Sequence, residues 1–331
     1  MKLVVLGSGA WGTALAISFS QRHQVTLWSR DEAHLTGLAA SRQNERYLPG
    51  IDLPDSIDIE KKLAVAIANA DLSLIATSTN GLGAITALLC RQSSKLPILW
   101  ACKGFDKETG QLPHETVGQL VGATSGIHFG ALSGPSFALE VAKGLPCALT
   151  LASNDLSFAR EMTAQLNGPT MRIYSSDDLV GVELGGALKN VMAIAAGICD
   201  GMQLGMNARA ALITRGLAEI VRLGVAMGGK PETFMGLTGL GDLVLTATGD
   251  LSRNRTVGVH LAQGRSLEAV LASLGHVAEG VNSAQTALAL AGKYRVDMPI
   301  TQAVNAVLFA NADPRETVRR LLSRDAKAES A

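Results

Sequence analysis

The chain has 331 residues, of which 47% are apolar and 18% are charged. Because a domain commonly has roughly 100–200 residues, this length favours two domains with well-filled cores and gives no reason to expect a disordered segment. Basic and acidic residues balance at 29 each, which excludes an electrostatic argument for nucleic acid or an anionic membrane as a partner.

The start of the chain and its cysteines favour a cytoplasmic protein with no integral membrane segment. The first apolar run, Leu3–Leu6, is too short for a signal peptide, and Val191–Cys199 is far shorter than the about 20 residues of a membrane-spanning helix. The 4 cysteines form no CxxC pair and have no His or Cys neighbour at metal-ligand spacing. We therefore expect reduced thiols and no metal site.

The first half of the chain alternates short apolar runs with helical patterns. The runs that predict strands are Leu3–Leu6, Val25–Trp28, Leu72–Ala76, Ile98–Ala101, Phe129–Leu132, Cys147–Leu151 and Met171–Tyr174. Helical patterns, such as Thr13–Gln21, Gly83–Arg91 and Leu156–Leu166, lie between several of them. This alternation predicts a mostly parallel sheet with helices on its faces.

The pattern changes near Asp177, after which no convincing strand is visible. Asp178–Cys199 is a long apolar helix pattern, and Asn207 is the expected N-cap of a helix that runs through Met227 and stops at two glycines. Asp313 followed by proline predicts a further helix start. The second half is therefore expected to be all-helical.

The glycines of the first turn carry the clearest functional signal. Gly7, Gly9 and Gly12 form a GxGxxG motif that follows a buried strand and opens a helix within a strand-helix-strand unit. Gly7 allows the tight turn, Gly9 lets the backbone approach a pyrophosphate, and Gly12 lets helix and strand pack closely. An ordinary glycine-rich turn is the alternative, but this context favours a dinucleotide-binding, Rossmann-like domain. We expect that domain over residues 1–180 and an all-α substrate domain over residues 181–331.

The end of the second strand bears on the choice of nicotinamide cofactor. An NAD enzyme places an acid there for the ribose hydroxyl, but the expected position is Ser29 and Arg30 follows it. An arginine suits a 2′-phosphate, so we expect NADP(H) to be preferred and NAD(H) to be accepted. Two alternatives stay open: Arg30 is a solvated turn residue, or a shift of one residue makes Asp31 the ribose ligand.

Two lysines stand out by their surroundings. Lys103 comes just after a predicted strand, at the edge of the sheet where ligands bind in open α/β folds. Lys189 lies inside the apolar helix among small residues. Its stem could follow the surface with the ammonium in water, or the amine could be desolvated with its pKa drawn toward neutrality for proton transfer. The spacing alone leaves these two readings equal.

Several polar turns are ambiguous on their own. Asp242 ends a glycine-rich turn, and Ser252-Arg253-Asn254 offers donors that suit a phosphate or carboxylate. A loop with Gly134 and Ser136 follows a strand end. A helix cap or a solvated turn explains each segment equally well.

Taken in order, these segments resemble the bacterial NAD(P)-dependent glycerol-3-phosphate dehydrogenase family over nearly the whole chain. The similar blocks are Gly7–Ala16, Trp100–Phe105, Ser133–Phe137, Val182–Asn190, Asn207–Glu219, Gly239–Thr246 and Ser252–Arg255, continued by Val277-x-Glu279-Gly280 and Met298–Ile300. Ala10 departs from the family, which often has serine there; a hydroxyl contact is lost, but backbone donors remain.

The resemblance implies a role for each candidate residue. It makes Lys189 the proton donor or acceptor, with Lys103 beside substrate and nicotinamide and with Asn190, Asp242 and Thr246 supporting the reacting centre. The implied substrate residues, besides Lys103, Lys189 and Asp242, are Gly134, Ser136, Ser252, Arg253 and Asn254. The implied cofactor residues, besides the glycines and Lys103, are Ala10, Trp11, Arg30, Tyr47, Ala138, Arg253, Val277 and Glu279.

The implied reaction is the reversible reduction of dihydroxyacetone phosphate to sn-glycerol 3-phosphate by NAD(P)H, which supplies glycerophospholipid synthesis. The expected partner is this small-molecule substrate, and the expected assembly is a homodimer. Two other functions stay open: a dehydrogenase for a hydroxy acid, and a dinucleotide sensor without catalysis. A sensor could dispense with Lys103, Lys189 and Asp242, all of which are present.

Overall fold

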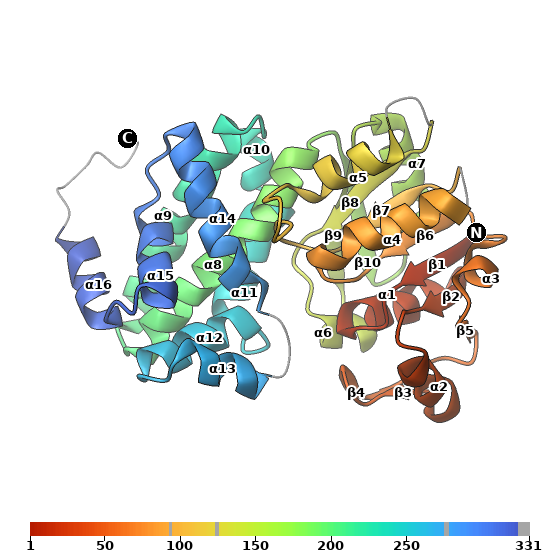
Figure 1. Cartoon of the computed structure of the whole chain (residues 1–331), viewed down its shortest axis with the longest axis horizontal. Coiled ribbons are helices and arrows are strands. Elements are labelled where there is room, and N and C mark those ends of the chain that lie inside the picture. Colours follow the sequence, from red (N-terminus) through yellow and green to blue (C-terminus); the bar gives the residue numbers. More distant parts are fainter. Residues whose placement is uncertain (93–94, 123–125, 275–277, 324–331) are drawn as a thin grey trace.

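A computed structural model of the chain describes residues 1–92, 95–122, 126–274 and 278–323. The N-terminal half forms a sheet flanked by helices on one side of the molecule, and the second half forms a group of helices on the other (Figure 1). Within the described part of residues 178–323, every regular element is helical. The predicted fold class, a Rossmann-like α/β domain followed by helices, is confirmed.

One sheet of eight strands forms the centre of the N-terminal half. Its order is β10 (Met171–Ser176), β9 (Cys147–Ser153), β8 (Phe129–Ser133), β7 (Ile98–Trp100), β6 (Leu72–Ile75), β1 (Lys2–Leu6), β2 (Gln24–Trp28) and β5 (Ile57–Ile59). All neighbours are parallel except β8 and β9, which are antiparallel. The mostly parallel character follows from strands that are buried on both faces, such as β1, whose last four residues are all buried.

The register of the central strands places the loops that follow them at one edge. Leu6 pairs with Trp28 of β2 and with Ile75 of β6, and Ile75 pairs with Trp100 of β7. These residues end their strands, so the loops that follow them leave the sheet together. In open α/β sheets this carboxyl edge is where ligands bind.

All the strands expected from the sequence are present, with ends shifted by at most two residues. The sequence did not reveal β5, which has three residues with an aspartate in the middle. It also did not reveal the hairpin of β3 (Gln43–Asn44) and β4 (Leu48–Asp52), which contains a proline and a glycine. Strands this short, or broken by proline and glycine, do not reach the length of alternation that predicts a strand.

The helices of the N-terminal half are α1 (Ala10–Ser20), α2 (Glu32–Ser41), α3 (Leu63–Ile67), α4 (Thr79–Gln92), α5 (Pro113–Val121), α6 (Ala138–Ala142) and α7 (Leu156–Leu166). Those of the second half are α8 (Leu179–Gly201), α9 (Gly205–Ala226), α10 (Pro231–Phe234), the π-helical turn η1 (Leu237–Gly241), α11 (Asp242–Thr248), α12 (Arg253–Ala262), α13 (Leu267–Leu274), α14 (Glu279–Tyr294), α15 (Pro299–Phe309) and α16 (Pro314–Leu322).

Helix α8 lies at the junction of the two halves. Asp178 begins it by accepting a hydrogen bond from the Gly181 amide at 2.8 Å. By length and apolarity α8 could cross a membrane, but 94% of its most apolar stretch is buried inside the protein. Its first turn packs in a core with the sheet, through Leu179 and Val182, and the rest packs in the core of the helical half. It is therefore a core helix shared by both halves.

The predicted start of α9 is wrong by a few residues. Asn207 lies inside the first turn, because the chain has already turned at Gln203 (φ 57°) and Gly205 (φ 86°) and the helix begins at Gly205. The N-cap position belongs to Leu204, which has no side-chain cap. The predicted end is correct to one residue, since α9 stops at Ala226 before two glycines.

Candidate active site

A cavity of about 870 Å³ lies at the carboxyl edge of the sheet, between its loops and the helical half. The candidate residues that line it are Gly7, Gly9, Ala10, Trp11, Arg30, Tyr47, Lys103, Ser136, Ala138, Lys189, Asn190, Thr246, Ser252, Arg253, Asn254 and Glu279. Gly12, Gly134 and Asp242 lie behind its wall, and Val277 lies outside the described residues. Segments far apart in the chain thus meet around one space.

The glycine loop, residues 7–12, forms one end of the cavity. Gly7 has φ 127°, and a Cβ there would lie 2.7 Å from the Ala76 carbonyl oxygen. A Cβ on Gly12 would lie 1.9 Å from the Gly7 carbonyl oxygen, whereas one on Gly9 would meet nothing within 4 Å. Gly7 and Gly12 are therefore required by packing, and the open space at Gly9 leaves room for a ligand.

The start of α1 has the character of an anion site. Gly9 is its N-cap and provides no side-chain acceptor for the first amides of the helix. Those N–H groups and the positive end of the helix dipole are suited to a pyrophosphate. The indole Nε1 of Trp11, at the same place, is buried without a hydrogen-bond partner. These residues fit a dinucleotide cofactor.

Asn44 of β3 supports the glycine loop from beneath and was missed by the sequence reading. Its side chain is fully buried, and Nδ2 donates to the Ser8 carbonyl at 2.9 Å and to Thr13 Oγ1 at 2.7 Å. These bonds hold the carbonyl that precedes Gly9. Because Asn44 is 36 residues from Ser8, no local pattern could have revealed it.

The end of β2 lies beside the glycine loop, because the Gly7 amide donates to the Trp28 carbonyl at 2.7 Å. Ser29, Arg30 and Asp31 all line the cavity, and the strand itself ends at Trp28. Asp31 Oδ1 accepts a hydrogen bond from the His34 amide at 2.9 Å and so caps α2. If Asp31 were the ribose ligand, one of its two oxygens would thus already be used in capping α2.

Two basic side chains that the sequence reading did not single out lie near the end of β2. His34 and Arg46 both line the cavity, and both contact the Tyr47 ring, His34 edge-on at 5.4 Å between ring centroids. Arg46 also lies 3.6 Å from Asp31 Oδ2. Both residues follow Arg30 closely in the sequence, but a histidine and an arginine at such a distance are too common to indicate a binding site.

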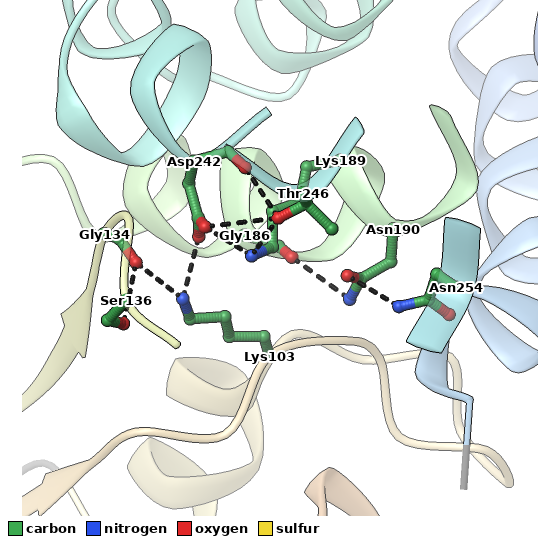
Figure 2. A network of polar contacts seen from close by, with 9 residues as sticks. All are labelled: Lys103, Gly134, Ser136, Gly186, Lys189, Asn190, Asp242, Thr246 and Asn254. Carbon is green, nitrogen blue, oxygen red and sulfur yellow. Dashed lines mark hydrogen bonds and ion pairs between the residues drawn. The ribbon is translucent and has the colours of Figure 1, made fainter. Parts of the chain in front are cut away.

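The lysine cluster, made of Lys103, Lys189, Asp242 and Thr246, lies at the other end (Figure 2). Asp242 is fully buried and accepts from Lys189 Nζ at 2.5 Å and from Lys103 Nζ at 2.7 Å, each on a different oxygen. Lys189 also donates to Thr246 Oγ1 at 3.0 Å, and Lys103 to the Gly134 carbonyl at 2.9 Å. One carboxylate therefore holds two ammonium groups side by side.

Small residues on α8 bring this cluster together. A Cβ on Gly185 would lie 2.5 Å from the Thr238 carbonyl oxygen, so only glycine lets η1 approach α8 this closely. Asp242 and Thr246 follow η1 on α11, one turn apart. The close packing of η1 on α8 thus delivers both side chains to Lys189.

Burial shifts the acidity of two groups at the cavity. It lowers the pKa of Lys189 to about 8, a shift that Asp242 opposes and Lys103 reinforces. It also raises the pKa of Glu279 to about 7, against the effect of Arg253 and the two lysines. An amine with such a pKa exchanges protons readily near neutral pH, which is the property of a general acid or base.

A second set of polar contacts extends from Asn190, the residue after Lys189 on α8, toward α12. Asn254 Nδ2 donates to Asn190 Oδ1 at 3.0 Å, and Asn254 Oδ1 accepts from the Gly280 amide at 3.0 Å. Ser252 Oγ accepts from the Arg255 amide at 3.2 Å and caps α12. Arg253 lies on the exposed wall of the cavity. The helix cap that was one reading of Ser252 is therefore real, and its hydroxyl, on a residue that lines the cavity, keeps a hydrogen that it can donate.

Comparison with known proteins gives one consistent result. Residues 2–159 match the model of the NAD-dependent glycerol-3-phosphate dehydrogenase N-terminus, and residues 178–319 match that of its C-terminus. A glycerol-3-phosphate dehydrogenase (NAD(P)+) from Ralstonia nicotianae is 56% identical over 336 residues, covering 100% of this chain and 99% of the relative. One from Aromatoleum aromaticum is 53% identical over 330 residues, covering 99% of this chain and 100% of the relative.

A solved structure agrees in shape as well as in sequence. The crystal structure of glycerol-3-phosphate dehydrogenase from Coxiella burnetii has a TM-score of 0.92 and 39% identity, and the match covers 98% of this chain and 99% of that one. The family models, the full-length relatives and the solved structure all indicate the same family. The chain belongs to the NAD-dependent glycerol-3-phosphate dehydrogenase family.

Proposed function

We propose that the lysine cluster and the glycine loop together reduce dihydroxyacetone phosphate to sn-glycerol 3-phosphate, reversibly. The observation that carries this proposal is the Lys189–Asp242–Lys103 arrangement at one end of a cavity whose other end suits a dinucleotide. The chain is an NAD(P)-dependent oxidoreductase, as are its full-length relatives.

The cofactor residues would act mainly by position. When bound, NAD(P)H supplies the hydride that reduces the carbonyl carbon. The residues that would hold it are Gly7, Gly9, Ala10, Trp11, Gly12, Arg30, Tyr47, Lys103, Ala138, Arg253, Val277 and Glu279. The amides at the start of α1 would bind the pyrophosphate, since no side chain uses them.

Lys189 is the proposed proton donor in reduction and the acceptor in oxidation. Its ammonium group donates to Asp242 and Thr246, which fix its direction. Its lowered pKa makes transfer to the developing alkoxide of the substrate favourable near neutral pH. Lys103 provides a second positive charge beside that of Lys189, which stabilises the negative charge that forms on the substrate oxygen. Asn190 supports this centre through its bond with Asn254.

The substrate phosphate is assigned to the polar group on α12 and the loop after β8. Arg253 supplies charge, Ser252 its hydroxyl, and Asn254 the amide hydrogen that does not bond Asn190. Gly134 and Ser136 would complete this pocket, and Ser136 Oγ already donates to the Gly134 carbonyl at 3.1 Å.

The preference among cofactors follows from the end of β2. We infer that NADP(H) is favoured over NAD(H), because Arg30 is exposed at the cavity and Asp31 is engaged in capping α2. Arg46 would add positive charge beside the 2′-phosphate, and His34 lines the same part of the cavity.

The wider setting is proposed on the same basis. The product would feed glycerophospholipid synthesis in the cytoplasm, and the working unit would be a homodimer. Residues 1–180 would form the cofactor domain and residues 181–331 the substrate domain.

One assay tests the activity directly. The purified chain should oxidise NADPH when given dihydroxyacetone phosphate and do so far more slowly with dihydroxyacetone, which lacks the phosphate. Equal rates with both compounds, or none with either, would contradict the assignment.

A further inference from the structure

Glu183 is a buried carboxylate to which the proposed reaction gives no role. It lies on α8, six residues before Lys189, and only 6% of its surface is exposed. A buried charge is costly unless donors surround it. Its partners therefore indicate what this group does.

Three donors from the N-terminal half meet the Glu183 carboxylate. Oε1 accepts from Trp100 Nε1 at 2.9 Å and from the His114 amide at 3.0 Å. Oε2 lies 2.5 Å from His114 Nδ1. Trp100 ends β7 and His114 lies in the first turn of α5. A single side chain thus joins α8 to the end of β7 in the sheet and to α5.

These contacts lie beside the segments that carry both lysines of the cluster. Trp100 is three residues before Lys103, and on α8 Gly186 lies about one turn from Glu183 and about one turn from Lys189. A Cβ on Gly186 would lie 3.5 Å from Lys103 Cγ, so the stem of Lys103 packs on α8 one turn from Glu183. The separation of the two ammonium groups depends on how α8 sits against the end of β7.

We propose that Glu183 is a positioning residue: by anchoring α8 to Trp100 and His114, it sets Lys103 and Lys189 at the spacing that Asp242 bridges. This proposal rests on the proposed function, because it concerns the same pair of lysines. It adds a residue that touches neither substrate nor cofactor and that the cavity does not include.

The chemistry of Glu183 and His114 explains why a carboxylate occupies this position. An acceptor with two oxygens can bond three donors and can pair with His114 whether the imidazole is neutral or protonated. Burial lowers the pKa of His114, but Glu183, followed by Glu115, raises it by more. Burial raises the pKa of Glu183 itself, and its donors from His114 and Trp100 oppose this. The other titratable neighbour is the Cys102 thiol, whose pKa is raised by burial and then by Glu279 and Glu183.

Glu183→Gln keeps the size and packing of the side chain but removes its charge. The amide oxygen can still accept from Trp100 and the His114 amide, and the NH2 group can donate to neutral His114 Nδ1. Once His114 is protonated, two donors face each other. The kcat of this variant relative to the parent should be close to one at about pH 8.5. Because burial lowers the pKa of His114 once the carboxylate is gone, the relative kcat should fall roughly tenfold only on the acid side of the usual histidine pKa, toward about pH 5.

Two companion variants sharpen the result. Glu183→Ala should lower kcat at every pH, by up to about 100-fold, because displaced reacting groups cost that much. In the double variant Glu183→Gln with His114→Gln, neither replaced side chain titrates, so its kcat relative to the parent should not show this fall with pH. The dissociation constant for NADPH, measured by protein fluorescence, should be unchanged in all three.

A matched control comes from Glu219, a second buried carboxylate that accepts from the Ile300 amide and from the Thr301 amide and hydroxyl, away from the lysines. Glu219→Gln should lower the melting temperature, but its kcat relative to the parent should not change with pH.

The positioning role of Glu183 is overturned if the relative kcat of Glu183→Gln does not change with pH, if Glu219→Gln shows the same fall, or if NADPH binding weakens as much as kcat. Inactivity of the parent toward dihydroxyacetone phosphate would instead overturn the proposed function.

Discussion

The two ends of the cavity are built in different ways. The glycine loop comes from six consecutive residues and binds through backbone amides, so its information is local in the sequence. The lysine cluster is built from side chains on a loop, on α8 and on α11, and Lys189 and Asp242 are 53 residues apart. Changes in the cluster should therefore affect the chemical step, while changes around the loop should affect cofactor binding.

The largest effect is expected from Lys189→Met. The variant lacks the proton donor but keeps an unbranched side chain of similar length, so kcat should fall about 100- to 10,000-fold. NADPH binding, measured by fluorescence titration, should stay close to that of the parent. Activity within a few-fold of the parent would remove Lys189 from the proton transfer.

Arg253→Ala should come next. Loss of a charge-assisted bond to phosphate should reduce kcat/KM for dihydroxyacetone phosphate by about 10- to 150-fold. The activity on dihydroxyacetone, which has no phosphate, is the internal control and should change little. An equal loss on both substrates would leave Arg253 only its cofactor role or a structural one, and a carboxylate substrate would become a better candidate.

Cofactor choice should respond to the double change Ser29→Asp with Arg30→Ala. It removes a cation and adds a carboxylate beside the 2′-phosphate, so NADPH affinity should drop by about 10- to 150-fold while NADH affinity changes much less. The parent should show a lower KM for NADPH than for NADH at one pH and salt concentration. If the parent prefers NADH, Asp31 rather than Ser29 is aligned with the ribose.

The smallest effect is a pH dependence of the parent itself. Reduction needs the protonated form of Lys189, whose pKa is about 8, so kcat/KM for dihydroxyacetone phosphate should be level below this value and fall as pH rises through it. Oxidation of glycerol 3-phosphate needs the neutral amine and should show the opposite limb. A reduction rate that increases through about pH 8 would contradict this assignment.

The contrast between the glycine loop and the lysine cluster also explains which features could be predicted from the sequence. The strands β1, β2, β6 to β10 and the glycine loop were visible because their signals lie within a few residues. The burial of Lys189 stayed undecided until the structure showed Asp242 and Thr246 against it. Asn44, His34 and Glu183 were not recognised as supporting residues, because their partners lie on other elements. The resemblance to a family supplied candidate roles, but not the contacts that explain them.

The position of α8 has a consequence for how the protein unfolds. Leu179 and Val182 pack with the sheet, while Leu184 and the following apolar residues pack with the helical half. Removing either half would strip one end of this helix of its neighbours, so neither half should persist without the other. Calorimetry should accordingly show one cooperative transition, with equal van't Hoff and calorimetric enthalpies, and limited proteolysis should release no stable single-domain fragment. Two resolved transitions would mean that α8 transmits less between the halves than its packing indicates.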